Sequence, residues 1–191
     1  MSEGRADGQM EAIYGQEPRM KASVFVVPGA RLSPGDRPQE EREHMSSFEV
    51  PFEEIPHTAD WAIRAYGRTL PELFANAAMG MYSLLVDLDA LGESERREIE
   101  VEAASPEGLL VAWLNELVYH TEREHLAFKR FEIHELRLPD PGDPDSLGRL
   151  RATVYGERTR EMRKYIKAVT YHNVAIQQED GRYWVELVFD V

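Results

Sequence analysis

The chain has 191 residues, a hydrophobic fraction of 42% and a formal net charge of −13, which is enough for one well-packed, acidic domain. The absence of cysteine excludes disulfide frameworks, thiolate zinc sites and thiol chemistry, and it suits a cytoplasmic location. No apolar run in the sequence approaches the roughly 18 residues that a membrane-spanning helix needs, and the N-terminus lacks the apolar stretch of a signal peptide, so we expect no membrane association.

Most of the negative charge lies after residue 44. A domain this acidic repels a phosphate backbone at long range, so we do not expect direct binding of RNA or DNA to be its main activity. The acids either keep the protein in solution or form a face that meets a cation or a basic protein. Composition alone favours neither.

Residues 1–44 are predicted to be a disordered N-terminal extension. They are rich in Gly, Pro, Arg and Glu, and they bury too little apolar surface to offset the conformational entropy lost on ordering. Because Met45 opens a segment that looks like a native start, residues 1–44 are also consistent with coding sequence upstream of the real initiation site. The folded domain is therefore predicted at residues 45–191.

Helix and strand patterns alternate from Phe48 onwards. The first helix is predicted after Thr69, because Thr69 and Glu72 have the spacing of a capping box. The second is predicted after Ser105, because Ser105 and Pro106 suit the N-cap and the first helical position. The pattern predicts a single α+β domain, in which two amphipathic helices pack on a mostly antiparallel sheet. The predicted strands, in chain order, are 48–55, 61–66, 97–103, 130–138, 150–155, 166–177 and 183–189, with a hairpin turn at 179–181 between the last two.

Two carboxylates stand in unusual sequence settings, while familiar catalytic motifs such as a Gly-rich phosphate loop or H-E-x-x-H do not occur. Asp60 follows a turn that begins at Pro56 and leads into a strand, and Asp190 lies in an apolar terminal strand, where a carboxylate is costly to bury without a partner. Asp190 either faces water on an edge strand or joins Asp60 in a hard-cation site, with the terminal carboxylate of Val191 as a third donor. Oxygen ligands favour Ca²⁺, Mg²⁺ or Mn²⁺.

Lys167 lies among apolar residues of the predicted strand at 166–177. Such a lysine has one of three roles: it extends its charge into water at a sheet edge, it balances nearby carboxylates, or it contacts a phosphate. The sequence spacing does not distinguish between these roles. His120 and His125 are five positions apart, which is off the i, i+4 spacing of two ligands on one helix face. We interpret both as solvated residues at the end of the second helix.

Three segments of the chain resemble the archease family. Residues 57–60 read H-T-A-D and are followed by Gly67, residues 166–172 read I-K-A-V-T-Y-H, and residues 183–191 end in F-D-V. They occur in the family's order with the two predicted helices between them, so the resemblance covers residues 48–191. Two features depart from the family pattern: the extension of 44 residues, and Asn173, where an acid is expected.

This resemblance implies a function. Archeases activate RtcB-type RNA ligases, which depend on GTP and metal, by promoting guanylylation and turnover of the ligase in tRNA splicing and RNA repair; they do not catalyse ligation. The family's acidic metal ligands are carried over as Asp60 and Asp190, and its functional lysine as Lys167. Val191 and His57 are further candidates for the same site. The resemblance thus implies a cytoplasmic, divalent-metal-binding accessory protein, not an enzyme, whose partner is an RtcB-type RNA ligase.

Two other functions are consistent with these residues. One is a small divalent-metal-dependent phosphohydrolase, in which Asp60 and Asp190 hold the ion and His57 or His172 acts as the base; the lack of a recognisable nucleophile counts against it. The other is a protein-interaction module whose acids are solvated. Both metal-dependent functions require the two distant aspartates to converge.

Overall fold

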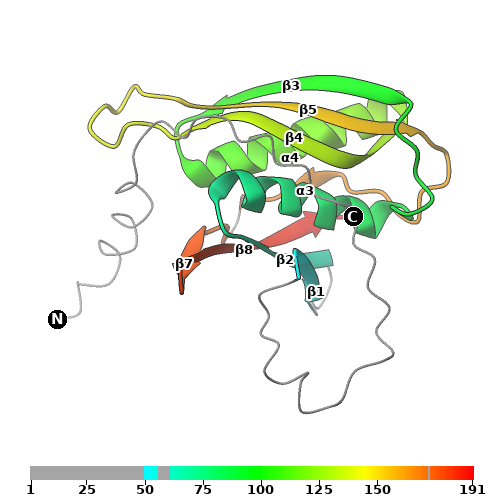
Figure 1. The fold of residues 1–191 in the computed structure, drawn as a ribbon, viewed down its shortest axis with the longest axis horizontal. Coiled ribbons are helices and arrows are strands. Elements are labelled where there is room, and N and C mark those ends of the chain that lie inside the picture. Colours follow the sequence, from blue (N-terminus) through cyan, green and yellow to red (C-terminus); the bar gives the residue numbers. More distant parts are fainter. Residues whose placement is uncertain (1–49, 56–60, 172) are drawn as a thin grey trace, which may run out of the picture.

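Two antiparallel sheets enclose a pair of helices in the computed structural model (Figure 1). The structure describes residues 50–55, 61–171 and 173–191, so the extension predicted at 1–44 lies outside it and stays a prediction. No helix of these described ranges is long and apolar enough to cross a membrane. The elements in chain order are β1 (Phe52–Ile55), β2 (Trp61–Gly67), α3 (Leu70–Leu85), β3 (Glu95–Ala103), α4 (Pro106–Glu124), β4 (Leu126–Arg137), β5 (Gly148–Arg158), β6 (Ala168–Val169), β7 (Gln177–Glu179) and β8 (Arg182–Asp190).

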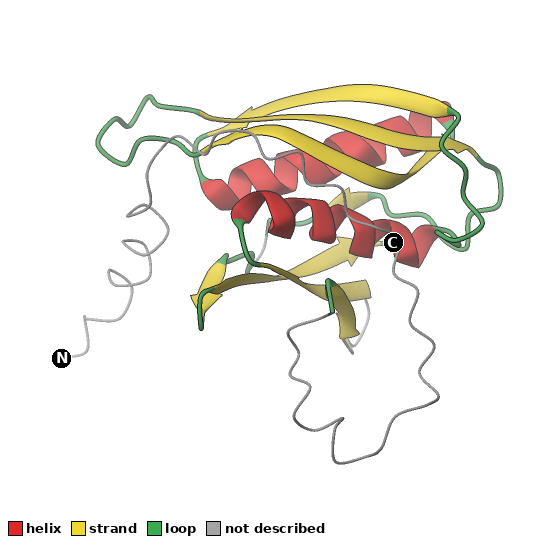
Figure 2. Cartoon of the chain, viewed as in Figure 1, coloured by secondary structure: helices red, strands yellow, loops and turns green. Residues whose placement is uncertain are grey.

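The strands form two sheets, which we name after their central strands. The β8 sheet has the order β1-β2-β8-β6, with β7 also paired to β8, and the β5 sheet has the order β3-β5-β4. All strand pairs in both sheets are antiparallel. The predicted α+β class with two helices is confirmed, but the strands expected in one sheet lie in two, on opposite sides of the helices (Figure 2).

The two-sheet arrangement follows from the burial of α3. Thirteen of its 16 residues are buried, and a helix that is apolar around most of its circumference must be covered on more than one side. Accordingly α3 contacts β2 of one sheet and β4 of the other. Two polar side chains inside this core have partners: the Tyr82 hydroxyl lies 2.8 Å from Oγ1 of Thr121, and Nε1 of Trp113 donates to the carbonyl oxygen of Phe74 at 3.1 Å.

Both predicted helix starts are confirmed. Oγ1 of Thr69 accepts a hydrogen bond from the main-chain N–H of Glu72 at 3.3 Å, and Oγ of Ser105 accepts one from Gly108 at 3.0 Å. These bonds satisfy N–H groups that have no partner within the helix. The Glu72 carboxylate turns back to the main-chain N–H of Arg68 at 2.8 Å, so the capping box closes one residue before the N-cap.

The prediction of one long strand at 166–177 is wrong. Among the described residues of this region, only β6 and β7 pair with β8, with Val169 opposite Phe189 and Gln177 opposite Trp184. Eight residue steps thus face five on β8, so the chain between β6 and β7 must leave the sheet edge. Asn173 lies in this excursion with a φ of 61°, a left-handed conformation that interrupts a strand. The hairpin turn predicted before β8 is confirmed by positive φ angles at the two residues that precede Arg182.

Candidate functional site

Three predicted site residues meet at the end of β8. The main-chain N–H of Lys167 donates to the carbonyl oxygen of Asp190 at 2.8 Å, one residue before the Ala168–Asp190 pair of β6 and β8. The Lys167 ammonium then reaches past Asp190 and donates to a main-chain oxygen of Val191 at 2.9 Å. Residues 24 positions apart in sequence are therefore held together by the register of β6 on β8. We call this end of β8 the C-terminal corner.

The first described residue of β2 lies beside the same corner. Trp61 pairs with Phe189, the residue before Asp190, and Nζ of Lys164 lies 3.8 Å from the centroid of the Trp61 ring, which is a cation–π distance. Asp60 and His57, the other predicted site residues, lie outside the described residues, as does His172. Their part in the site stays a prediction.

Asn115 of α4 fixes the position of β6. Its side-chain Nδ2 donates to the carbonyl oxygen of Val169 at 3.2 Å, and its Oδ1 accepts from the N–H of Val169 at 2.9 Å. The amide thus satisfies both main-chain groups of one edge residue, much as a neighbouring strand does. Asn115 was not predicted from the sequence, where the available signal was one amide among the apolar residues of the second helix.

The chemistry of the C-terminal corner is that of exposed oxygen donors. The Asp190 side chain is exposed, because it follows the inward-facing Phe189 in the alternation of β8. Its carboxylate makes no hydrogen bond or ion pair with another described residue. A carboxylate and a main-chain oxygen are donors that hard divalent cations accept. Within the described ranges, however, no group of three or more His, Asp or Glu residues is arranged to hold a metal ion.

Of the two helix-end histidines, His120 differs from its interpretation as a solvated residue, whereas His125 agrees with it. The side chain of His120 is mostly buried, and its ring lies between Glu124, 2.8 Å from Nδ1, and Glu116, 3.6 Å from Nε2. Hydrogen bonds from Arg97 and from His120 lower the pKa of Glu124 to about 2. His125 is exposed and ends α4 in a left-handed conformation. These contacts make His120 part of an ion-pair network on the helix and not of the C-terminal corner.

A model of the Archease protein family matches residues 52–191. The chain belongs to the archease family. The matched region includes every described element of the archease domain, from β1 to β8. The fold and the C-terminal corner described above are therefore features of an archease.

Similar proteins support this assignment. The chain is 37% identical over 142 residues to Protein archease of Methanopyrus kandleri, covering 74% of this chain and 100% of that protein. It is 34% identical over 145 residues to Protein archease of Pyrococcus abyssi, covering 73% and 98%. Among solved structures, the solution structure of Methanobacterium thermoautotrophicum protein 1598 matches with a TM-score of 0.59 and 30% identity, covering 74% of this chain and 99% of that one.

Proposed function

We propose that this archease is a cytoplasmic accessory protein that activates an RtcB-type RNA ligase by promoting its guanylylation, without catalysing ligation itself. The observation that carries the proposal is the convergence of Lys167, Asp190 and Val191 at the C-terminal corner. These are three of the residues that the resemblance to the family marks as functional. Membership of the family supports the accessory role, and the corner supplies the chemistry.

In this proposal the C-terminal corner binds a divalent cation, Ca²⁺, Mg²⁺ or Mn²⁺, through oxygens of Asp190, Asp60 and Val191. The pairing of Trp61 with Phe189 supports the inclusion of Asp60, because consecutive Cα atoms are about 3.8 Å apart. When bound, the ion would neutralise negative charge on the phosphates of a nucleoside triphosphate. The exposed Asp190 side chain offers its carboxylate to the ion, and Lys167 holds the main-chain oxygen of Val191 in place or turns its ammonium to a phosphate oxygen.

The charge of the chain supports a protein partner with a basic, nucleotide-binding cleft. A net charge of −13 attracts such a cleft and orients the encounter. Since the corner lies at the end of β8 and the Asp190 side chain is exposed, docking there presents Asp190 to the partner's nucleotide. This arrangement requires no nucleophile from the archease itself.

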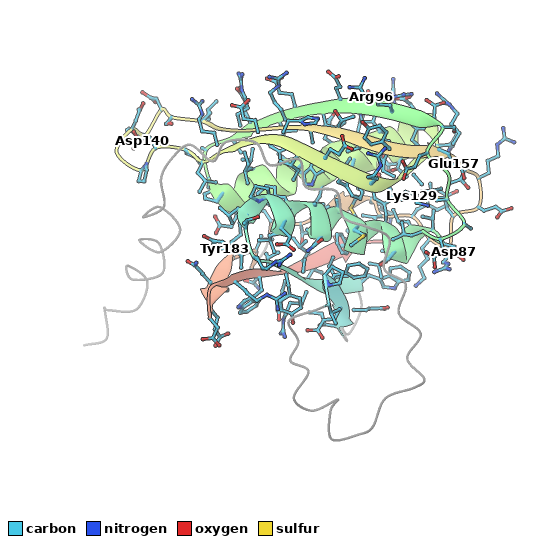
Figure 3. The ribbon with its side chains drawn as sticks, viewed as in Figure 1. Asp87, Arg96, Lys129, Asp140, Glu157 and Tyr183 are labelled. Atoms are coloured by element: carbon cyan, nitrogen blue, oxygen red, sulfur yellow. The ribbon has the colours of Figure 1, made fainter. Side chains whose placement is uncertain are left out.

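The test is a guanylylation assay. An RtcB-type ligase is incubated with labelled GTP and Mn²⁺, with and without this archease, and covalent labelling of the ligase is followed in time. We expect Asp190→Asn to lose the stimulation, because it removes the charged donor while keeping the shape of the side chain. Asp140→Asn is the matched control, since Asp140 lies in the β4–β5 loop far from the corner (Figure 3).

Two results would contradict the proposal. The first is the absence of any stimulation by the intact protein, and the second is full stimulation by Asp190→Asn. The same preparations should be tested against a phosphodiester substrate. Hydrolysis that disappears in Asp190→Asn would instead support the metal-dependent phosphohydrolase.

A further inference from the structure

The connection between β5 and β6 is a basic, exposed stretch on an acidic protein. We call residues 159–167 the anchored segment. Its side chains at Arg160, Arg163, Lys164 and Lys167 are exposed, and so is Tyr165, at 60%. Glu161 is the one acid within it. The segment therefore concentrates positive charge and an exposed aromatic ring on a chain whose net charge is strongly negative.

Three main-chain hydrogen bonds hold the segment at intervals of four residues. The N–H of Thr159 donates to His125 at 2.9 Å, that of Arg163 to Leu85 at 2.7 Å, and that of Lys167 to Asp190 at 2.8 Å. The three acceptors are carbonyl oxygens at the ends of α4, α3 and β8, so the segment crosses the ends of three elements (Figure 1). It lacks regular secondary structure, yet it is fixed along its length.

Buried side chains strengthen this anchorage. Ile166 is only 3% exposed and belongs to the hydrophobic core, and Met162 packs against that core. The cations therefore stand on a backbone that is already ordered, and a ligand would not have to order it on binding. That property separates the anchored segment from an ordinary surface loop with charged residues.

The cations of the segment are poorly neutralised within the described part of the chain. Several arginines of the β5 sheet are paired closely with glutamates, as Arg96 is with Glu98 at 2.7 Å. By contrast, neither Arg160 nor Lys164 makes an ion pair with any described acid. Arg163 pairs with the exposed Asp87, which Figure 3 labels, and the distance between Nη2 of Arg163 and Oδ2 of Asp87 is 3.8 Å. Lys164 lies over the ring of Trp61, which does not cancel its charge, so the cations of the segment can still bind an anionic ligand.

We propose that the anchored segment binds the phosphate backbone of single-stranded RNA, with Arg160, Arg163 and Lys164 contacting phosphates and Tyr165 stacking on a base. Cations in line with an exposed aromatic ring are the combination that single-stranded nucleic acids recognise. The cations are spread along the segment instead of converging on one point, which fits a chain of phosphates better than a single triphosphate. The segment ends at Lys167, so a bound strand leads to the C-terminal corner.

Net charge does not forbid this contact. Surface charges separated by more than about 8 Å are largely screened at physiological ionic strength, so the acids elsewhere on the domain weaken RNA binding without abolishing it locally. The inference rests on the proposed function in one respect: an RNA end near the corner is the substrate of the ligase. Binding of single-stranded RNA to the anchored segment does not itself depend on activation of the ligase.

The test is a fluorescence-anisotropy titration of a short labelled single-stranded RNA with the full chain at low salt. We expect the intact protein to bind, and the double variant Arg160→Ser/Arg163→Ser to bind more weakly. The slope of log K against log salt concentration should become shallower by about 0.7 for each phosphate that the variant no longer neutralises. Tyr165→Ala should weaken binding by about 5- to 150-fold, the range expected when one base no longer stacks.

The matched control is Arg96→Ser/Arg151→Ser, which removes the same charge from two exposed arginines of the β5 sheet. Figure 3 labels Arg96 on the outer face of that sheet. Equal losses in the two double variants, or no binding by the intact protein, would overturn the inference. Displacement of the RNA by equimolar GTP would show a nucleotide site, and displacement by an acidic peptide would show a protein-docking site; either result would also overturn it. Since the guanylylation assay contains no RNA, the inference and the proposed function can fail separately.

Discussion

Replacing Lys167 with alanine separates a functional role from a structural one. In the wild type its ammonium donates to the main-chain oxygen of Val191 at 2.9 Å. The β5 sheet contains a matched lysine: Nζ of Lys129 donates to the carbonyl oxygen of Leu91 at 2.6 Å, and Figure 3 shows Lys129 on the opposite sheet. Lys129→Ala therefore removes the same kind of bond and the same charge, away from the C-terminal corner.

The expected change in stability is small for Lys167→Ala. Its side chain is exposed, and exposed charged pairs contribute about 0.2–1 kcal/mol to the free energy of unfolding. In a chain of this size 1 kcal/mol corresponds to about 2–4 °C in Tm, so Tm should fall by about 4 °C at most. A charge-assisted hydrogen bond to a phosphate or a metal-site oxygen is worth about 1.5–3 kcal/mol, so its removal corresponds to a decrease of about 10- to 150-fold in stimulation of guanylylation.

The assay compares the two variants in parallel. Thermal unfolding by circular dichroism gives Tm, and initial rates of ligase guanylylation with labelled GTP give the stimulation. We expect Lys167→Ala to lose stimulation with nearly unchanged Tm, and Lys129→Ala to retain stimulation. The reasoning is refuted if Lys167→Ala stimulates like the wild type, or if Lys129→Ala loses as much, because the effect would then not belong to the corner.

Three further outcomes are expected. Asn115→Ala leaves both main-chain groups of Val169 without partners, so the free energy of unfolding should fall by about 1–3 kcal/mol, measured by urea denaturation; a change below about 0.5 kcal/mol would show that the amide does not hold β6. Hydrogen bonding, mainly from Arg97, lowers the pKa of Glu124 from 4.5 to about 2, so its contribution to stability is present above pH 4.5 and is lost as the pH falls towards 2. The difference in unfolding free energy between the wild type and Glu124→Gln should therefore shrink over that pH range. A difference that stays constant would exclude this dependence. Deletion of residues 1–44 should leave the stimulation of guanylylation intact, and a loss would reveal a role for the extension.

The helices were predictable because their signals are local. Thr69 with Glu72 and Ser105 with Pro106 place the N-caps, since a cap needs only a side-chain oxygen within three residues of the N–H groups it satisfies. The division of the strands into two sheets was not predictable in this way. Period-2 alternation identifies a strand but not its partner. The pairing of β2 with β8 joins residues that are distant in sequence, such as Arg64 and Glu186, which are 122 positions apart.

The site was predictable only in part, for the same physical reason. Spacing along the chain singled out Asp190 and Lys167, but their contact depends on the register of a two-residue strand, β6, on β8. That register is held by Asn115 from α4. A single amide among the apolar residues of a helix does not show which strand it contacts, because that contact depends on tertiary packing. The prediction of a continuous strand through Asn173 failed because the chain from β6 to β7 has more residues than the part of β8 that it faces. That mismatch depends on how the strands pair and not on local propensity.

The position of β8 also governs how the molecule is assembled during translation. It is the last described strand to be synthesised, yet it lies between β2 and β6. Until it leaves the ribosome, β1 and β2 have no third strand and part of α3 stays uncovered, whereas β3, β4 and β5 are already complete. The nascent chain is therefore expected to pass through a half-built stage with exposed apolar surface, which is prone to aggregation. A premature stop before Arg182 would leave a product that lacks both β8 and the acid at its end, and that product would keep the exposed apolar surface.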